Sequence, residues 1–166
     1  IIGGSAKGHP LKMPKGGKTR PAMSRVKESL FSILAPRLLD GRILDLFAGS
    51  GSVGIEALSR GATFGVFVDS SHECTKVIRE NLEKTKLVHL AKIFQQDCLG
   101  FLQNQTFDPF DLVFIDPPYF KGLLEPLLDF IPHYPAFNDR TIFIIERQKK
   151  DELHLEVRPF LNLIDE

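Results

Sequence analysis

Short apolar runs alternate with helical stretches along most of the chain, beginning after Asp40–Gly41. Each run of four to six residues is almost continuously apolar, which is typical of parallel strands buried on both faces. Strands of this kind joined by helices predict a doubly wound α/β fold with a mainly parallel sheet, because right-handed crossovers place helices on both faces. The predicted strands are Ile43–Phe47, Phe64–Val68, Ala91–Phe94, Leu112–Ile115 and Thr141–Ile145. The predicted helices between them are Ser52–Ser59, Glu73–Thr85, Leu99–Gln103 and Leu123–Phe130, and Gly61 lies where a helix C-cap is expected.

The beginning of the chain has a different pattern. Its first 18 residues are rich in Gly, Pro and Lys and predict an irregular or hairpin-like arm. Pro21 then opens a helical pattern, which Pro36 interrupts. The apolar face predicted for this helix consists of Val26, Leu30, Ile33 and Leu34. We therefore expect an N-terminal arm over residues 1–22 and one domain over residues 23–166.

Length and composition fit this division. The chain has 166 residues, 43% of them hydrophobic and 25% charged, which is ordinary for one globular domain with a sizeable core. No apolar run approaches the ~18 residues of a membrane span, and no secretory pattern opens the chain, so we expect no membrane partner. The two cysteines, Cys74 and Cys98, are too few for a disulfide framework and lack zinc spacing. We expect reduced thiols, no metal and a cytoplasmic protein.

Charge is distributed unevenly, although the formal net charge is zero. The first 27 residues hold seven cations and no acid. These cations are Lys7, Lys12, Lys15, Lys18, Arg20, Arg25 and Lys27. A basic segment on an otherwise acidic chain favours a polyanion, such as a nucleic acid, as the partner. The alternative is a solvated tail that keeps the protein soluble.

The first predicted strand runs into a glycine-rich loop, "LDLFAGSGSVG", from Leu44 to Gly54. The spacing Gly49-x-Gly51-x-x-Gly54, with a strand before it and a helix after it, fits the dinucleotide fingerprint. Small residues let the backbone approach a ligand, and the start of the helix offers free N–H groups. Asp45 would disfavour a phosphate here and favour a cationic ligand. A carboxylate bonded to local backbone is the alternative for Asp45.

Two further acids follow predicted strands. Asp69, after the second strand, can accept both hydroxyls of a ribose, as an acid does in NAD sites. Asp97, after the third, can accept from the exocyclic amine of adenine, with the backbone N–H of Cys98 at a ring nitrogen. Helix N-capping is the alternative for both acids. Because ligands bind beyond the carboxyl ends of parallel strands, these residues together predict a site for an adenosine that carries a cation, which describes S-adenosyl-L-methionine.

The fourth strand ends on "DPPY", Asp116 to Tyr119. Neither proline can donate to a strand ladder, so the strand is expected to end here on a rigid loop. The Asp116 carboxylate and the Pro117 carbonyl can accept from the N–H groups of an exocyclic amine and aim its lone pair at a methyl group. Tyr119, with Phe120, offers a stacking face for a base. A structural turn with a buried aromatic residue is the alternative.

These residues resemble a known family. "DLFAGSGSVGIEALSRGA" and "FIDPPY" look like a class I S-adenosylmethionine-dependent methyltransferase with a Rossmann-like fold that acts on an amino group. The opening "IIGGSAKG" and "RPAMSRVKESLFSIL" resemble the RsmD family of bacterial 16S rRNA guanine-N2 methyltransferases. The resemblance implies 16S rRNA, or an assembling small ribosomal subunit, as the partner. It also implies that the glycine loop and the acids after the second and third strands hold the cofactor, and that Arg20 and Arg25 contact RNA.

The candidate site residues form three groups. The catalytic candidates are Asp116, Pro117, Pro118 and Tyr119. The cofactor-binding candidates are Asp45, Phe47, Ala48, Gly49, Ser50, Gly51, Asp69, Asp97 and Cys98. The RNA-binding candidates are Lys18, Arg20 and Arg25. We expect a monomer.

The sequence departs from the family pattern at three places. Ala22 stands where the family usually has Thr, and Asp69-Ser70-Ser71 lacks a second acid or Asn. The chain also stops near the expected sixth strand, so we expect the last strand to be short, truncated or missing.

Three other functions stay open at this point. An NAD-dependent oxidoreductase would explain Asp69 but leaves Asp45 and the Pro-Pro motif unused. A methyltransferase acting on adenine N6 in DNA, or on a glutamine amide, would share the Pro-Pro-aromatic motif. A non-catalytic RNA-binding module would not need an intact Asp116 and glycine loop.

Overall fold

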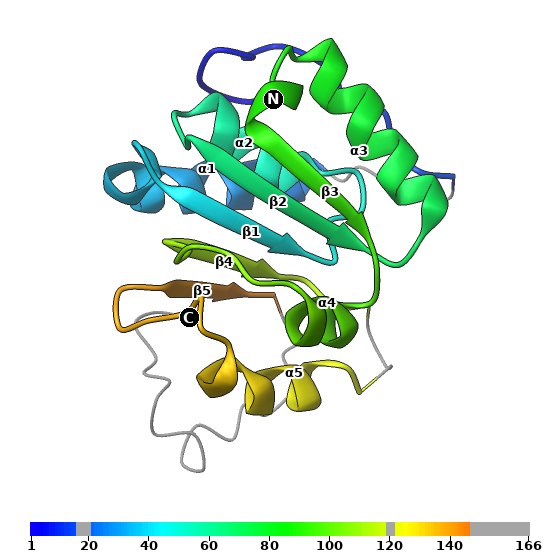
Figure 1. Cartoon of the computed structure of the whole chain (residues 1–166). Helices are drawn as coiled ribbons and strands as arrows, with labels where there is room; N and C mark the ends of the chain where they lie inside the picture. The colour runs from blue at the N-terminus through cyan, green and yellow to red at the C-terminus, as the bar shows by residue number, and fades with distance from the viewer. Residues whose placement is uncertain (16–20, 119–121, 147–166) are drawn as a thin grey trace.

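A computed structural model describes residues 1–15, 21–118 and 122–146 of the chain. Its core is one five-stranded sheet in the order β3-β2-β1-β4-β5, with every neighbouring pair parallel (Figure 1). The strands are β1 (Arg42–Leu46), β2 (Phe64–Asp69), β3 (Ala91–Gln95), β4 (Leu112–Ile115) and β5 (Ile142–Ile145). The predicted α/β fold with a parallel sheet is confirmed, and each predicted strand lies within one residue of an observed one.

In the described residues, five α-helices connect and cover the strands. They are α1 (Pro21–Leu38), α2 (Ser52–Ser59), α3 (His72–Lys84), α4 (Cys98–Asn104) and α5 (Leu124–Phe130). Two short 3₁₀ turns, η1 (Val88–Leu90) and η2 (Ile131–His133), were not expected from the pattern. Gly61 follows α2 with a φ of +114° and donates to the carbonyl of Leu58, as expected near a helix C-cap. Among the described helices, none has both the length and the apolar character needed to cross a bilayer.

The sheet separates two hydrophobic clusters. One contains α1, α2 and α3 residues together with Ile43 of β1, and the other contains α4 and α5 residues together with Leu44 and Leu46 (Figure 1). Successive side chains of a strand point to opposite faces, so Asp45 points to the same face as Ile43. This alternation directs Asp45 towards α2 and leaves Arg42, Leu44 and Leu46 on the other face of β1.

Helix α1 differs from its predicted form in two ways. It continues through Pro36 to Leu38, because a proline in the last turn removes only one helix hydrogen bond. The predicted apolar face was half right: Leu34 is buried and Leu30 packs against the core, whereas Val26 and Ile33 are each 69% exposed. The buried residues are Phe31, Leu34 and Leu38, which share a helical spacing of their own. Two apolar stripes in one helix make its orientation ambiguous from sequence.

The N-terminal residues pack against α2 and α3. The buried carboxylate of Glu56 in α2 accepts hydrogen bonds from the backbone N–H groups of Ile2 and Gly3, both at 2.8 Å. Further along the N-terminal segment, the backbone of Lys12 forms two hydrogen bonds with the side chain of Asn81 in α3. The Lys12 N–H donates to Asn81 Oδ1, and Asn81 Nδ2 donates to the Lys12 carbonyl. Residues 1–15 therefore share extensive contacts with the helices, and the division of the chain at residue 22 stays a prediction.

Candidate active site

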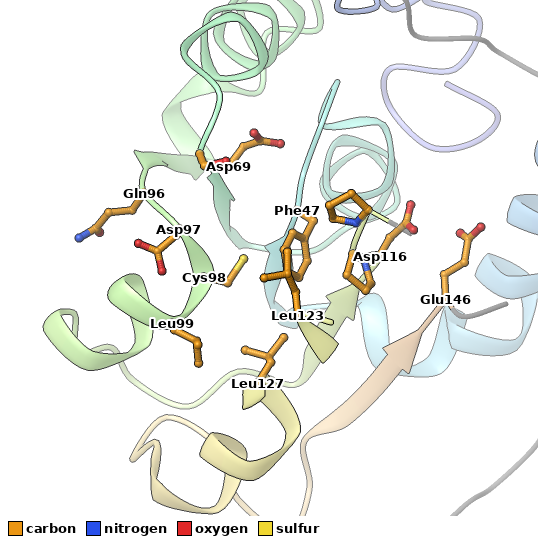
Figure 2. Close-up of a pocket in the computed structure, with 13 residues that line it drawn as sticks. Phe47, Asp69, Gln96, Asp97, Cys98, Leu99, Asp116, Leu123, Leu127 and Glu146 are labelled. Carbon is orange, nitrogen blue, oxygen red and sulfur yellow. The ribbon is translucent and has the colours of Figure 1, made fainter. Parts of the chain in front are cut away.

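A cavity of about 640 Å³ lies at the carboxyl ends of the strands (Figure 2). Its walls come from the loop after β1, from the ends of β2 to β5 and from α5. The strand order changes direction between β1 and β4, and ligands of open α/β sheets bind at such a point. The volume is that of a small-molecule site. The lining residues are Phe47, Asp69, Ser70, Gln96, Asp97, Cys98, Leu99, Asp116, Pro117, Pro118, Leu123, Leu127 and Glu146.

The glycine loop turns sharply beside this cavity. Phe47, Gly49 and Gly51 all have positive φ angles, of +64°, +56° and +74°. For Phe47 this is a strained conformation, which places a non-glycine residue with a large side chain in the cavity wall. A Cβ atom on Gly49 would meet only the Phe47 carbonyl oxygen, at 4.0 Å, so the backbone there is open to close approach. Ala48 donates its N–H to the Val68 carbonyl at 3.0 Å and ties the loop to β2.

The third glycine of the motif has a packing role. A Cβ atom on Gly54 would lie 2.4 Å from the Phe67 ring, so only glycine lets α2 approach the sheet this closely. The Gly54 N–H donates to Asp45 Oδ2 at 3.0 Å. Gly51, the N-cap residue of α2, has no side chain to cap the first turn, and Asp45 supplies that acceptor from the strand instead.

Asp45 is 4% exposed and is absent from the residues that line the cavity. Burial raises the pKa of Asp45 to about 7, against the opposing effect of the Gly54 hydrogen bond. The structure therefore shows the local backbone bond that was the alternative for this residue. Its contact with a cationic ligand stays a prediction.

Asp69 organises the loop after β1 and the turn before α3. Its Oδ2 accepts from the Gly49 N–H and its Oδ1 from the Ser71 N–H, both at 2.8 Å. Ser71, and not Asp69, is the N-cap of α3, because its hydroxyl accepts from the Cys74 N–H at 3.3 Å. Two backbone donors hold the Asp69 carboxylate at the cavity wall, in an orientation fixed by the fold.

Asp97 and Cys98 lie at the start of α4 and line the cavity. Asp97 caps this helix, because its Oδ1 accepts from the Gly100 N–H at 2.8 Å. N-capping was the alternative to cofactor binding for Asp97. The capping residue nevertheless lines the cavity (Figure 2). Burial raises the pKa of the Cys98 thiol to about 12, so the thiol is neutral at physiological pH.

Strand β4 ends at Ile115, and Asp116, Pro117 and Pro118 then line the cavity. The Asp116 carboxyl is open to the cavity solvent yet surrounded by enough protein for burial to raise its pKa to about 6. The negative charge of Glu146 adds to this increase in the pKa of Asp116. The predicted end of the strand at the acid is confirmed.

Several other predicted residues take no part in the cavity or lie outside the described residues. Ala48, Gly49, Ser50 and Gly51 belong to the loop after β1 without being cavity-lining residues. Lys18, Arg20 and Tyr119 lie outside the described residues, and Arg25 lies in α1. No group of three or more His, Cys, Asp or Glu side chains in the described residues could hold a metal ion.

Three residues around the site were missed in the sequence. Glu146 follows β5 as Asp116 follows β4, so the same signal, an acid directly after an apolar strand, could have found it. Glu56 and Asn81 lie within helices, where nothing distinguishes them from solvent-facing polar residues, yet both are fully buried. Asn81 also donates to the Ser50 carbonyl at 2.9 Å and thereby links the glycine loop to the N-terminal residues.

A parallel sheet with a glycine loop after β1, acids after β2 and β3, and Asp-Pro-Pro after β4 is the arrangement of a class I methyltransferase. The family model described as "Conserved hypothetical protein 95" matches residues 1–164. The chain belongs to this family, and the resemblance to the RsmD family is confirmed.

Individual relatives agree with this assignment. YlbH of Bacillus subtilis is 38% identical over 157 residues, which cover 92% of this chain and 84% of that protein. "Ribosomal RNA small subunit methyltransferase D" of Escherichia coli K12 is 34% identical over 92% of this chain and 76% of its own length. The solved structure of yhhF from Escherichia coli superposes with a TM-score of 0.81 at 33% identity and covers 92% of this chain and 84% of its own.

Proposed function

We propose that the protein transfers a methyl group from S-adenosyl-L-methionine to the exocyclic N2 of a guanine in 16S rRNA. The family resemblance points to guanine 966 of that RNA. Relatives named as ribosomal RNA small subunit methyltransferase D support the broader activity, methylation of ribosomal RNA. The observation that carries the proposal is that Asp116-Pro117-Pro118 lines the same cavity as Asp69 and Phe47 of the glycine loop.

The residues around the cavity fit the cofactor. Asp69 is fixed by two backbone donors, and a carboxylate has further lone pairs with which to accept the two hydroxyls of a ribose. The open backbone at Gly49 and the apolar Phe47 and Leu99 side chains suit the flat and uncharged parts of an adenosine. When bound, S-adenosyl-L-methionine supplies a methyl group made electrophilic by its sulfonium.

Asp116 and Pro117 would orient the acceptor amine. The exocyclic amine of a base is a poor nucleophile because its lone pair is conjugated with the ring. Acceptors on its N–H groups favour a more pyramidal nitrogen, and the two prolines keep these acceptors rigid, which in-line displacement requires. The methylated nitrogen is strongly acidic and gives its proton to water, so no separate base is required. Tyr119 would stack on the base.

The flanks of the basic segment support an RNA contact beside this cavity. Lys15 donates its backbone N–H to Glu73 in the first turn of α3. The Lys27 side chain binds the Ser52 carbonyl in the first turn of α2. Both helices begin at the edge of the sheet where the cavity lies, so Lys15 and Lys27, which flank the remaining cations in the sequence, lie near that edge. A phosphate backbone bound there would bring a base towards Asp116.

Methyl transfer to RNA and its product are measured together. The protein is incubated with S-adenosyl-L-methionine carrying a tritiated methyl group and with 16S rRNA, either naked or in small-subunit particles from cells that lack the gene. Nucleosides from the RNA are then separated by mass spectrometry. N2-methylguanosine is the expected product, whereas N6-methyladenosine, or oxidation of NADH in place of methyl transfer, would replace this proposal with one of its alternatives. The cytoplasmic location and the monomeric state remain part of the proposal.

A further inference from the structure

Glu146 occupies a position beside Asp116 that the sheet itself dictates. Ile115 of β4 pairs with Ile145 of β5, and the Glu146 N–H donates to the Ile115 carbonyl at 2.9 Å. The next residues along the two parallel strands, Asp116 and Glu146, therefore leave the sheet as neighbours on the same face. Both line the cavity, and Figure 2 shows their carboxylates pointing the same way.

The proposed chemistry uses Asp116 but leaves Glu146 without a role. Two carboxylates side by side repel each other, and this repulsion contributes to the raised pKa of Asp116. Such a pair is stabilised when a ligand presents two neighbouring N–H donors to it. The Watson–Crick edge of guanine does so, since N1–H and the N2 amine are adjacent donors. Adenine presents its N6 amine beside N1, which is an acceptor and would face a carboxylate unfavourably.

We infer that Glu146 is a specificity-determining residue that accepts the N1–H of the target guanine, while Asp116 accepts from its N2 amine. This inference rests on the proposed function and extends it, because it explains why guanine and not adenine would be the acceptor in a site whose Asp-Pro-Pro motif suits either amine. A site built to accept a hydrogen bond rejects an analogue that places an acceptor there.

The test changes the Watson–Crick edge of the base at positions 1 and 6, and one atom of the protein side chain. Target RNA is prepared with guanine or with 2,6-diaminopurine at the methylated position; the second base keeps the N2 amine but has an acceptor at N1. The wild-type protein should favour guanine in kcat/KM by about 10- to 100-fold, the range of one hydrogen bond to a charged group. In Glu146→Gln the side-chain amide can donate to an N1 acceptor, so this preference should fall to within about threefold.

A matched control removes a carboxylate elsewhere. Glu83 is an exposed residue of α3, so Glu83→Gln loses the same charge far from the cavity. This variant should keep the wild-type ratio of kcat/KM for guanine to kcat/KM for 2,6-diaminopurine. Circular dichroism and S-adenosyl-L-methionine affinity show whether Glu146→Gln folds and binds the cofactor normally.

The outcomes separate the inference from the function on which it rests. A wild-type protein that makes N2-methylguanosine but uses diaminopurine equally well contradicts the role of Glu146, whether or not the variant folds. The same conclusion follows if folded Glu146→Gln keeps the wild-type preference. If the wild-type protein makes no N2-methylguanosine in either RNA context, the proposed function fails and the inference fails with it.

Discussion

Replacing Asp69 by alanine tests how the protein would hold its cofactor. The substitution removes the acceptor of two backbone N–H groups, on Gly49 and Ser71, each bonded at 2.8 Å. It also removes the proposed partner of the ribose hydroxyls. Leaving one partly buried donor without an acceptor costs about 1–3 kcal/mol. The Gly49 donor lies in the loop that shapes the site, so we expect S-adenosyl-L-methionine affinity to fall by a similar amount, about 5- to 150-fold.

Isothermal titration calorimetry on the full chain measures this affinity, and urea unfolding measures the change in stability. Ser71→Ala is the matched control, because it removes the N-cap of α3 in the same turn without lining the cavity. That control should lose about 1 kcal/mol of stability and keep its cofactor affinity. A folded Asp69→Ala protein that binds S-adenosyl-L-methionine within twofold of wild type would refute the role given to Asp69.

Three further predictions concern catalysis, stability and RNA binding. The pKa of Asp116 is raised to about 6, and its ionised form is the better hydrogen-bond acceptor. The single-turnover methylation rate should therefore be constant above about pH 7 and fall below pH 6, by close to tenfold per pH unit. A rate that stays constant down to pH 5 would contradict this. Glu56→Gln removes a buried carboxylate bonded to the N-terminal backbone and to nearby cations, so urea unfolding should show a loss of about 3 kcal/mol, against less than about 0.5 kcal/mol for exposed Glu83→Gln. Replacing Arg20 and Arg25 by alanine should weaken RNA binding and flatten its dependence on salt in filter-binding assays, with unchanged cofactor affinity; an unchanged salt dependence would show that these residues are only solvated.

The fold was largely predictable because buried parallel strands have a strong signal. Ile43–Phe47 and its counterparts are short, almost purely apolar and separated by helical spacing, which few other arrangements produce. The orientation of α1 was not predictable, since its residues form two apolar stripes and tertiary packing, including the contact of Phe31 with Phe114, selects Phe31 over Val26. Tertiary contacts decide such cases, and they leave no local pattern.

The site was predictable where it depended on strand ends. Asp69, Asp97 and Asp116 all line the cavity because parallel strands end at one edge, so sequence position implies spatial proximity. Asp45 was harder to interpret, because its bond to the Gly54 N–H depends on how closely α2 approaches β1. The buried contacts of Glu56 join residues more than 50 positions apart, and no spacing rule reveals them.

The most direct test of the central claim compares wild type and Asp116→Ala on 16S rRNA, with N2-methylguanosine quantified by mass spectrometry. The account predicts that wild type forms this nucleoside and that Asp116→Ala forms it at least ~100-fold more slowly, on the scale of losing one positioned polar group in an active site. Cofactor affinity and thermal stability of the variant should stay near wild type, because Asp116 would face the base. A folded Asp116→Ala protein that methylates guanine at the wild-type rate would contradict the account.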